Sequence, residues 1–376
     1  MKRWVLLLAA LLVLTPTLPA EEENPFHDSA TRRFRKDKER NVRKAASRKK
    51  KELREMGVKS VRVKAPGDWP RKVAVPKGTE LQEIPAPQGF AGHLYASNNY
   101  VYFSPVELKP SAQKTVSRLC ECAFAANKAI AEVLPVPRPM VERGDRKFVV
   151  TLMPSMEEYR AAGGPQSSAG VFMGSYRQGA YPLKEEDVAM DQVMIPFESL
   201  GLNRSGAVQK EDIDTHALVH ELTHQQFLLN SLPIWANEGW AEYVGYVPYV
   251  GEDLDFDRGF SLILHTARER SGQGALDFDF TLEEFLTMDQ QRMYACMPQG
   301  KDTYTLSVMT VAFFVHLDGK RGIDAMKAYL RAILDGKSHE EAAGILVAPY
   351  RTPIRLQQAF TRAWKSKKVK VTFSGR

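Results

Sequence analysis

The chain has 376 residues, of which 44% are hydrophobic and 26% charged, and its net charge at pH 7 is +7. The excess of basic residues is local: residues 32–59 hold fourteen Lys or Arg and four acidic residues, whereas residues 60–376 together carry a net charge of −1. Few aromatic residues accompany the basic stretch, which argues against a nucleic-acid partner. The remaining length is sufficient for a two-lobed core around a cleft.

Residues 1–20 have the pattern of an export signal. A short basic start precedes the uncharged apolar run 4–14, which ends before the acidic residues 21–23. This run is too short to span a bilayer, so we expect cleavage near Ala20 and an exported protein, periplasmic or extracellular. An uncleaved anchor is the alternative.

Residues 21–59 are expected to form a basic, poorly ordered linker. The charge of residues 32–59 could attract an anionic envelope, but a plain solvated linker is the favoured interpretation. Export also implies an oxidising compartment, in which disulfides persist. The chain has three cysteines, so at least one must be free, and either Cys120 or Cys122 could pair with Cys296.

Residues 60–200 are predicted to form an N-terminal α/β lobe. Two β-like runs flank Asn98-Asn99, as in a hairpin. Apolar residues then recur at helical spacing, and shorter β-like runs follow. The expected elements are strands at 93–97, 100–103, 147–153, 169–176 and 188–196, and helices at 111–134 and 155–162.

The segment 212–246 carries the residues that point to chemistry. It contains His220-Glu221-Leu222-Thr223-His224, the H-E-x-x-H pattern, in an apolar stripe of helical spacing. Residues four apart share a face of a helix, so His220 and His224 can bind one metal ion. Glu221 is then placed to act on a water bound to that ion.

A second helix is expected after Pro233, because the segment 230–233 stops the first one. This helix carries Glu238 and Glu242 on one face. Catalytic zinc sites usually have three protein ligands and one open position, and a short helix–turn–helix can bring Glu238 to the ion as the third ligand. Glu242, one turn later, can accept the N–H of a ligating His and fix its orientation.

The motif H-E-L-T-H followed by N-E-G-W-A-E-Y resembles the gluzincin metallopeptidases, the thermolysin-like and aminopeptidase-like superfamily. The resemblance covers residues 216–334 and is strongest in these two motifs. It implies zinc as the cofactor, with His220, His224 and Glu238 as ligands. It also implies that Glu221 is the general base and that Glu242 is a partner outside the ligand set.

The same resemblance implies a role for Tyr304, which lies 66 residues after Glu238. Gluzincins of the aminopeptidase type carry a Tyr at a similar distance, whose phenol could donate a hydrogen bond to the developing oxyanion. A core Tyr at a helix start is the alternative. The segment 169–174 stands where that group has G-x-M-E-N but lacks the Glu, so exopeptidase and endopeptidase activity both stay open. By the same resemblance, the strand at 169–176 is expected at a sheet edge, where an extended peptide could pair.

Residues 201–376 are predicted to contain the metal-site helices and a C-terminal helical lobe. Thr281 and Glu284 form a capping-box pattern at a helix start. His216 could replace His220 as a ligand or orient the site, whereas His265 and His316 are interpreted as core residues. Beyond the metal-site helices, helices are expected at 257–269, 281–287, 304–317, 323–334 and 353–365, and a strand at 368–373.

These observations predict an α+β fold, in which a small mixed β-sheet lobe packs on the H-E-x-x-H helix and a helical lobe follows, with the active-site cleft between them. The expected function is an exported zinc-dependent peptidase that cleaves a peptide or protein substrate, with Glu221 as general base. A zinc-binding envelope module without turnover and a zinc hydrolase of a non-peptide amide or ester are the alternatives. The His/His/Glu set favours zinc over other divalent metals, although the Irving–Williams order does not exclude them.

Overall fold

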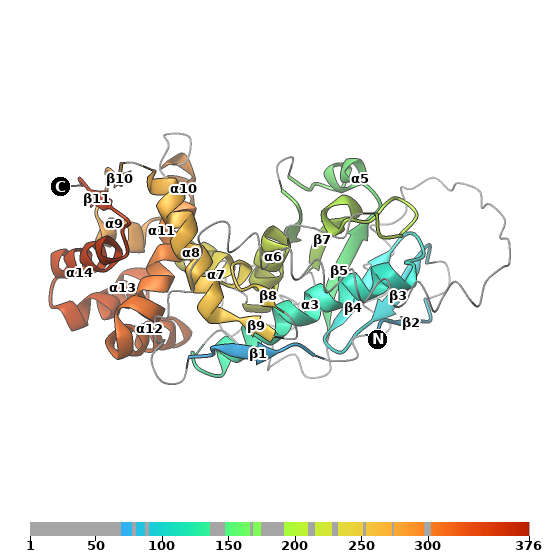
Figure 1. The fold of residues 1–376 in the computed structure, drawn as a ribbon, viewed down its shortest axis with the longest axis horizontal. Helices are drawn as coiled ribbons and strands as arrows, with labels where there is room; N and C mark the ends of the chain where they lie inside the picture. The colour runs from blue at the N-terminus through green and yellow to red at the C-terminus, as the bar shows by residue number, and fades with distance from the viewer. Residues whose placement is uncertain are drawn as a thin grey trace, which may run out of the picture.

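The computed structural model describes residues 69–76, 80–86, 90–135, 147–165, 168–173, 192–209, 215–227, 232–250, 253–272, 274–296 and 302–375. The predicted export signal at 1–20 and the basic linker at 21–59 lie outside these ranges. Within them, no helix has the length and apolar character needed to cross a membrane. The described part of the chain is mixed α and β, with a multi-stranded sheet and a helical region (Figure 1).

The main sheet has six strands in the order β2-β3-β4-β5-β7-β6. The central strands β4, β5 and β7 run parallel to one another, whereas β2, β3 and β6 are antiparallel to their neighbours. Strand β6, the described part of the strand predicted at 169–176, is therefore at an edge of the described sheet. The bounds are β2 Gln82–Ile84, β3 His93–Ala96, β4 Tyr100–Ser104, β5 Phe148–Met153, β6 Val171–Met173 and β7 Gln192–Pro196.

Helix α3 (Pro110–Ala131) connects β4 to β5 and packs against the sheet. Its residues Val116, Leu119 and Ala123 share a core with buried strand residues such as Tyr102 and Val150. The predicted hairpin is confirmed, since Ala96 of β3 pairs with Val101 of β4 across Asn98-Asn99. The short helix α5 (Met156–Ala161) is also as predicted, and the Ser155 hydroxyl caps it by accepting the Glu158 N–H.

Helix α6 (His216–Phe227) lies between two cores. Leu218 and Leu222 belong to the core under the sheet, Phe227 belongs to the helical core, and Val219 packs against both. On its polar side, Gln225 Nε2 donates to the Val149 carbonyl at 2.8 Å. The helix that carries the motif is thus fixed to the sheet and to the helical region at once.

The helical region follows α6, and its helices surround one large apolar core. Each helix predicted here forms, with its ends shifted by a few residues, and Thr281 and Glu284 make the expected capping box. Helices α10 and α13 were not predicted. The bounds are α7 Ile234–Gly245, α8 Phe256–Ser271, α9 Leu282–Thr287, α10 Gln290–Cys296, α11 Thr303–Ala312, the π-helix Phe313–Leu317, α12 Gly319–Leu334, α13 His339–Val347 and α14 Pro353–Ser366; β10 Leu276–Phe278 pairs in parallel with β11 Val371–Phe373.

The first described residues lie in space beside this helical region. Strand β1 (Lys72–Ala74) pairs with β9 (Asp253–Asp255), which also pairs with β8 (Tyr249–Val250). Trp69 is buried on Trp240, and its Nε1–H donates to the Tyr243 hydroxyl at 3.0 Å. Sequence order and spatial order therefore differ at this end, and the predicted division into lobes at residues 200 and 201 stays a prediction.

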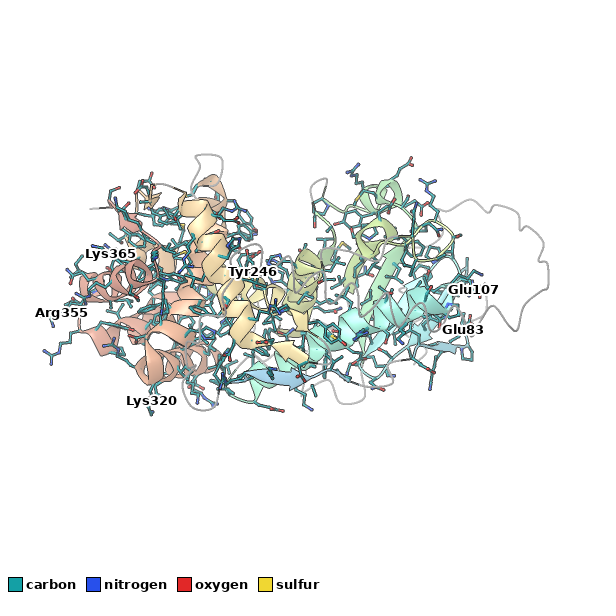
Figure 2. All side chains as sticks on the ribbon, in the orientation of Figure 1. Glu83, Glu107, Tyr246, Lys320, Arg355 and Lys365 are labelled. Atoms are coloured by element: carbon teal, nitrogen blue, oxygen red, sulfur yellow. The ribbon has the colours of Figure 1, made fainter. Side chains whose placement is uncertain are left out.

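The two ends of the molecule differ in their elements (Figures 1 and 2). Glu83 and Glu107 lie at the end formed by the sheet, whereas Lys320 and Arg355 lie at the end formed by the C-terminal helices (Figure 2). Helices α6 and α7 lie between these ends (Figure 1). The predicted metal-site segment is thus central in the molecule.

The three cysteines are buried and form no disulfide. Cys120 packs in the core under the sheet, whereas Cys122 and Cys296 pack in the helical core. Burial raises the pKa of the Cys122 thiol to about 11 and that of Cys120 further. Neither of the two pairings considered from the sequence is present.

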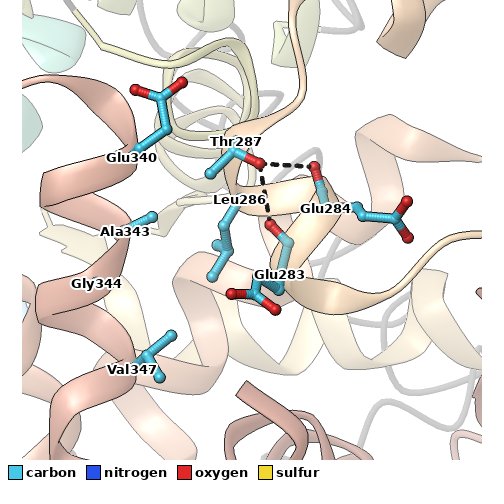
Figure 3. A pocket seen from close by; sticks show the side chains of 8 residues that line it. All are labelled: Glu283, Glu284, Leu286, Thr287, Glu340, Ala343, Gly344 and Val347. Atoms are coloured by element: carbon cyan, nitrogen blue, oxygen red, sulfur yellow. Dashed lines mark hydrogen bonds between the residues drawn. The ribbon is translucent and has the colours of Figure 1, made fainter. Parts of the chain in front are cut away.

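A surface pocket lies between α9 and α13 (Figure 3). Leu286 and Thr287 of α9 line one side of it, and Ala343 and Val347 of α13 line the other. Three acidic residues, Glu283, Glu284 and Glu340, also line it. No residue of the H-E-x-x-H segment takes part, so this pocket is separate from the predicted site.

Candidate metal centre

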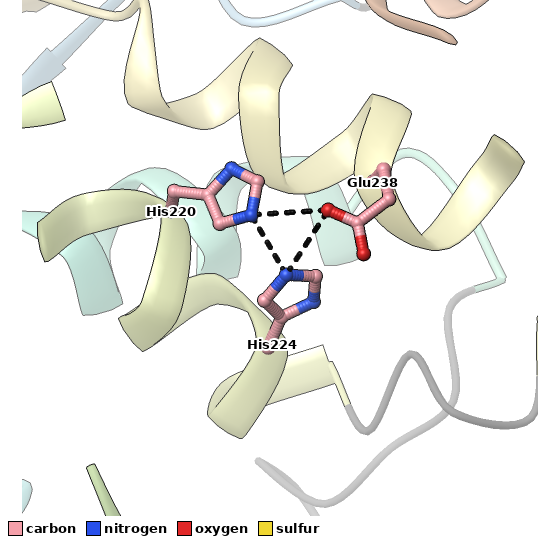
Figure 4. Close-up of side chains that lie close together, drawn as sticks. All are labelled: His220, His224 and Glu238. Carbon is pink, nitrogen blue, oxygen red and sulfur yellow. Dashed lines mark hydrogen bonds and ion pairs between the residues drawn. The ribbon is translucent and has the colours of Figure 1, made fainter. Parts of the chain in front are cut away.

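Three buried side chains from α6 and α7 converge on one point (Figure 4). Nε2 of His224 lies 2.8 Å from Nε2 of His220. Oε2 of Glu238 lies 3.2 Å from Nε2 of His220 and 3.6 Å from Nε2 of His224. The side chains of His220 and His224 are each 10% exposed and that of Glu238 is 7% exposed. The group can bind a metal ion.

A hydrogen-bond acceptor lies behind each imidazole, on the side away from the point of convergence. Nδ1 of His224 lies 3.0 Å from Oδ1 of Asn237, and Nδ1 of His220 lies 3.1 Å from Oε1 of Glu242. An acceptor at Nδ1 places the ring proton there, so that Nε2 carries the lone pair. Each Nδ1 thus has an oxygen within 3.1 Å, and Nε2 is the ring atom of each histidine that faces the point of convergence.

The geometry of the three inward atoms fits a metal ion of the size of zinc. A triangle with their three separations as sides has a circumscribed radius of about 1.9 Å, shorter than Zn–N and Zn–O bonds of roughly 2.0–2.2 Å. A single point can therefore lie one bond length from all three atoms. Two lone pairs and a carboxylate at these distances repel one another, and a proton or a cation between them removes the repulsion.

The ionisation of the surrounding groups agrees with this need for positive charge. Burial alone lowers the pKa of His220, but Glu238 and Glu242 outweigh it and raise that pKa to about 10. Burial acts in the opposite sense on Glu242, yet His216 and His220 lower its pKa to about 2. Against its burial, the pKa of Glu238 is likewise held well below its usual range by His224 and His220. Both carboxylates are ionised, and His220 holds a proton that a bound cation would replace.

Glu221 projects from the same helix but does not belong to this group. Its Oε2 accepts the backbone N–H of Phe172, in edge strand β6, at 2.8 Å. That contact fixes one carboxylate oxygen, and a carboxylate can accept a proton on either of its two oxygens. Glu221 is thus a carboxylate held by the sheet edge and not by the ligand group.

Tyr304 lies beside the ligand group, in the first turn of α11. Its ring centroid is 6.4 Å from that of His220. Burial, the charge of Glu238 and the neighbouring phenol of Tyr294 raise the pKa of Tyr304 well above its usual range. The phenol therefore keeps its proton and can act as a hydrogen-bond donor.

Tyr294, on α10, is a second phenol at the same place. It interacts with the Tyr304 phenol, and its hydroxyl accepts from Gln290 Nε2 at 3.2 Å. Burial and the charges of Glu238 and Glu221 raise the pKa of Tyr294, so both carboxylates lie close enough to influence it. Helix α10 brings this residue to the site from a segment in which the sequence predicted no helix.

The close packing of α7 on α11 holds Glu238 and Tyr304 near each other. Gly239 makes this possible: a Cβ at that position would lie 2.7 Å from the carbonyl oxygen of Ser307 on α11. Pro233 precedes α7 as its N-cap rather than lying in its first turn, and its carbonyl accepts from Ala236 and Asn237. Helix α7 therefore begins at Ile234, and Glu238, one turn later, faces the two imidazoles (Figure 4).

Three further histidines considered from the sequence, His216, His265 and His316, occupy different environments. Nε2 of His216 lies 3.3 Å from Oε2 of Glu242, so this residue approaches the site from behind and is not in the ligand group. His316 is buried and its Nε2 lies 2.8 Å from the Tyr243 hydroxyl, and burial lowers its pKa to about 3. The prediction that His265 is a core residue is wrong. Its side chain is partly exposed, and its Nε2 lies 3.2 Å from Oε1 of Glu269, one helical turn away.

No protein-family model, curated protein or solved structure matches this chain. What the chain does must therefore be inferred from the site itself. The sequence named every member of the His220, His224 and Glu238 group together with Glu242. From the sequence, no role was assigned to Asn237, Tyr294 or the Phe172 N–H. Of these, only Asn237 lay inside a motif, as the Asn of N-E-G.

Proposed function

We propose that this protein is a zinc-dependent peptidase of the gluzincin type, exported from the cytoplasm. His220, His224 and Glu238 would hold the ion, Glu221 would be the general base, and Tyr304 a hydrogen-bond donor to the reacting carbonyl. The observation that carries the proposal is the convergence of three buried ligand atoms with an acceptor behind each imidazole. A helix with two surface histidines would have no such partners.

The zinc ion, when bound, would lower the pKa of a water and polarise a carbonyl group. Glu221 would accept the proton of the attacking water and return it to the leaving amine. The Phe172 N–H supports this role, because it fixes the carboxylate without neutralising it. Tyr304, protonated at neutral pH, would stabilise the negative charge that develops on the carbonyl oxygen.

The expected substrate is an extended peptide. Strand β6 is at the edge of the described sheet and contacts the general base directly, so a peptide paired along it would pass Glu221. In this proposal the sheet region and the helical region are two lobes, and the active-site cleft lies between them along α6. A free amino terminus need not be bound, because the segment 169–174 lacks the Glu of the aminopeptidase motif.

The test is metal analysis and a peptide-library cleavage assay on the purified protein and two variants. We expect one zinc per wild-type chain and a sharp fall in zinc content in His224→Ala. Glu221→Gln keeps the shape of the side chain, so zinc should remain while turnover falls by roughly 10²–10⁴-fold. His265→Ala, which removes a histidine away from the ligand group, is the matched control and should leave both unchanged.

Two outcomes would replace the proposal. An envelope-binding module would be favoured if the wild type binds zinc fully but cleaves no peptide, and if Glu221→Gln binds the same partners equally well. Hydrolysis of simple amides or esters but not peptides would favour a non-peptide hydrolase. The export proposal is tested separately, since an intact Met1 in the exported protein would contradict cleavage near Ala20.

A further inference from the structure

We propose that His216 is a positioning residue for the metal centre, acting through Glu242 on the orientation of His220. The proposal rests on the metal group and does not depend on which bond the protein cleaves. His216, His220 and His224 are spaced four residues apart, so all three lie on one face of α6. His220 and His224 belong to the candidate ligand group, whereas His216, one turn before His220, does not.

Glu242 joins His216 to His220 through its two different carboxylate oxygens. Oε2 lies 3.3 Å from His216 Nε2, and Oε1 lies 3.1 Å from His220 Nδ1. One contact would leave the carboxylate free to turn about its last carbon–carbon bond. Two ion-pair contacts, one on each oxygen, restrain how far the carboxylate can turn and with it the position of Oε1 beside the imidazole of His220, although neither contact has hydrogen-bond geometry.

The ring of His216 is itself held by α7. A Cβ at Gly245 would lie 3.0 Å from both Cδ2 and Nε2 of the ring, so the imidazole occupies the space that the glycine leaves. The ring of Tyr246 lies 4.5 Å from it, centroid to centroid, and Figure 2 places Tyr246 in the middle of the molecule. His216 is 28% exposed, so its place in this contact is set by neighbours rather than by full burial.

The position of His216 matters because Glu242 is largely buried. Its side chain is 16% exposed, and a buried carboxylate that loses one of two partners either turns towards water or loses its fixed direction. In both cases His220 would lose part of the restraint on its ring. The effect should be smaller than removal of Glu242, because the imidazole is 28% exposed and water can enter the space that it leaves.

The test is a double-mutant cycle in zinc affinity, measured by competition with a chromophoric chelator. His216→Ala should weaken zinc binding about 10-fold, at the lower end of the loss expected when a partner of a ligating His is removed. In the Glu242→Gln background the same substitution should change affinity by less than about 2-fold, because the path through Glu242 is already broken. His216→Gln keeps an N–H donor and should restore most of the affinity.

His265→Ala is the control, since this histidine also pairs with a Glu on a helix but lies outside the site. If His216→Ala does not fold, His216→Asn, whose side chain is too short to keep the contact, takes its place in the cycle. Equal losses in the wild-type and Glu242→Gln backgrounds, or no loss at all, would overturn the inference while leaving the metal centre intact. Absence of zinc binding by wild type would overturn both.

Discussion

At the scale of single residues, the two imidazoles of the candidate metal group differ in what lies behind them. His220 is backed by the carboxylate of Glu242, whereas His224 is backed by the neutral amide oxygen of Asn237. A carboxylate partner makes the imidazole a stronger electron donor than an amide partner does, because it adds a negative charge. As metal ligands the two imidazoles would therefore be unequal, and both partners come from α7, the helix that also supplies Glu238.

The role of Asn237 gives a direct prediction. Asn237→Ala removes the acceptor behind His224, so zinc affinity should fall by roughly 10–100-fold. Asn237→Asp keeps an acceptor oxygen and should bind zinc at least ten times more tightly than the alanine variant. Zinc affinity by chelator competition is the measurement. Equal affinities for the two variants would show that the amide oxygen does not hold the ring.

The pair of phenols gives a second prediction. Tyr304→Phe should keep zinc and lower kcat by about 10²–10³-fold, if the hydroxyl meets the developing oxyanion. Tyr294→Phe should also lower kcat, and the double variant should lose less than the product of the two effects, because the phenols interact. Tyr329→Phe, a buried phenol packed on Trp235, is the control. Multiplicative losses would contradict a joint role.

At the scale of elements, the sequence predicted those parts of the site that one segment carries. The spacing in H-E-x-x-H fixes which side chains share a face, so α6 and the order of its ligands followed from local rules. Tyr294 could not be predicted, because only the packing of α10 beside α11 brings it to Tyr304. In the contact of Phe172 with Glu221, a backbone N–H donates to a side-chain carboxylate 49 residues later in the chain, and no local sequence pattern predicts such a bond.

The packing of α7 on α11 gives a third prediction. Gly239→Ala would place a methyl group 2.7 Å from a backbone oxygen, so the two helices must separate, at a cost of about 1–3 kcal/mol. Gly344→Ala, at an exposed position of α13 where an added Cβ would meet no atom within 4 Å, should instead stabilise the protein by about 0.5–1 kcal/mol. Urea unfolding measures both. Stabilisation by Gly239→Ala would show that the helices are less closely packed than described.

At the scale of the whole molecule, the first described residues pack against the helical region, although the strands of the main sheet follow them directly in sequence. Trp69 is 3% exposed and belongs to the helical core, and β1 pairs with β9, more than 170 residues later. The sequence predicted short β-like runs in residues 60–110, but it gave no sign that β1 pairs with β9. A pairing between distant segments depends on tertiary contacts, which a local pattern does not encode.

This packing of the first described residues gives a fourth prediction, on truncation. A chain that starts at residue 60 should fold and retain any activity, since the predicted signal and linker precede the described part. A chain that starts at residue 76 lacks Trp69 and β1 and should lose about 3–5 kcal/mol of stability from the tryptophan alone. Urea unfolding of the two truncated chains measures the difference. Equal stability would show that the Trp69 contact contributes little.

The last prediction concerns how the stability of the whole protein depends on pH with and without zinc. In the metal-free protein the pKa of His220 is raised from 6.5 to about 10, so its contribution is fully present below pH 6.5 and is lost as the pH rises towards 10. The pKa of Glu242 is lowered from 4.5 to about 2, so its contribution is present above pH 4.5 and is lost as the pH falls towards 2. The network should therefore stabilise the metal-free protein most between pH 4.5 and 6.5.

Between pH 6.5 and 9 the free energy of unfolding of the metal-free protein should fall by up to about 1.4 kcal/mol per pH unit, because one more proton is bound in the folded state than in the unfolded state. Zinc takes the place of that proton, so the zinc-loaded protein should not show this fall, while zinc itself should dissociate as protons compete at acid pH. Urea unfolding at several pH values, with chelator or with zinc, measures both. His220→Gln should abolish the slope of the metal-free protein. Identical slopes with and without zinc would mean that the ion does not bind where His220 holds its proton.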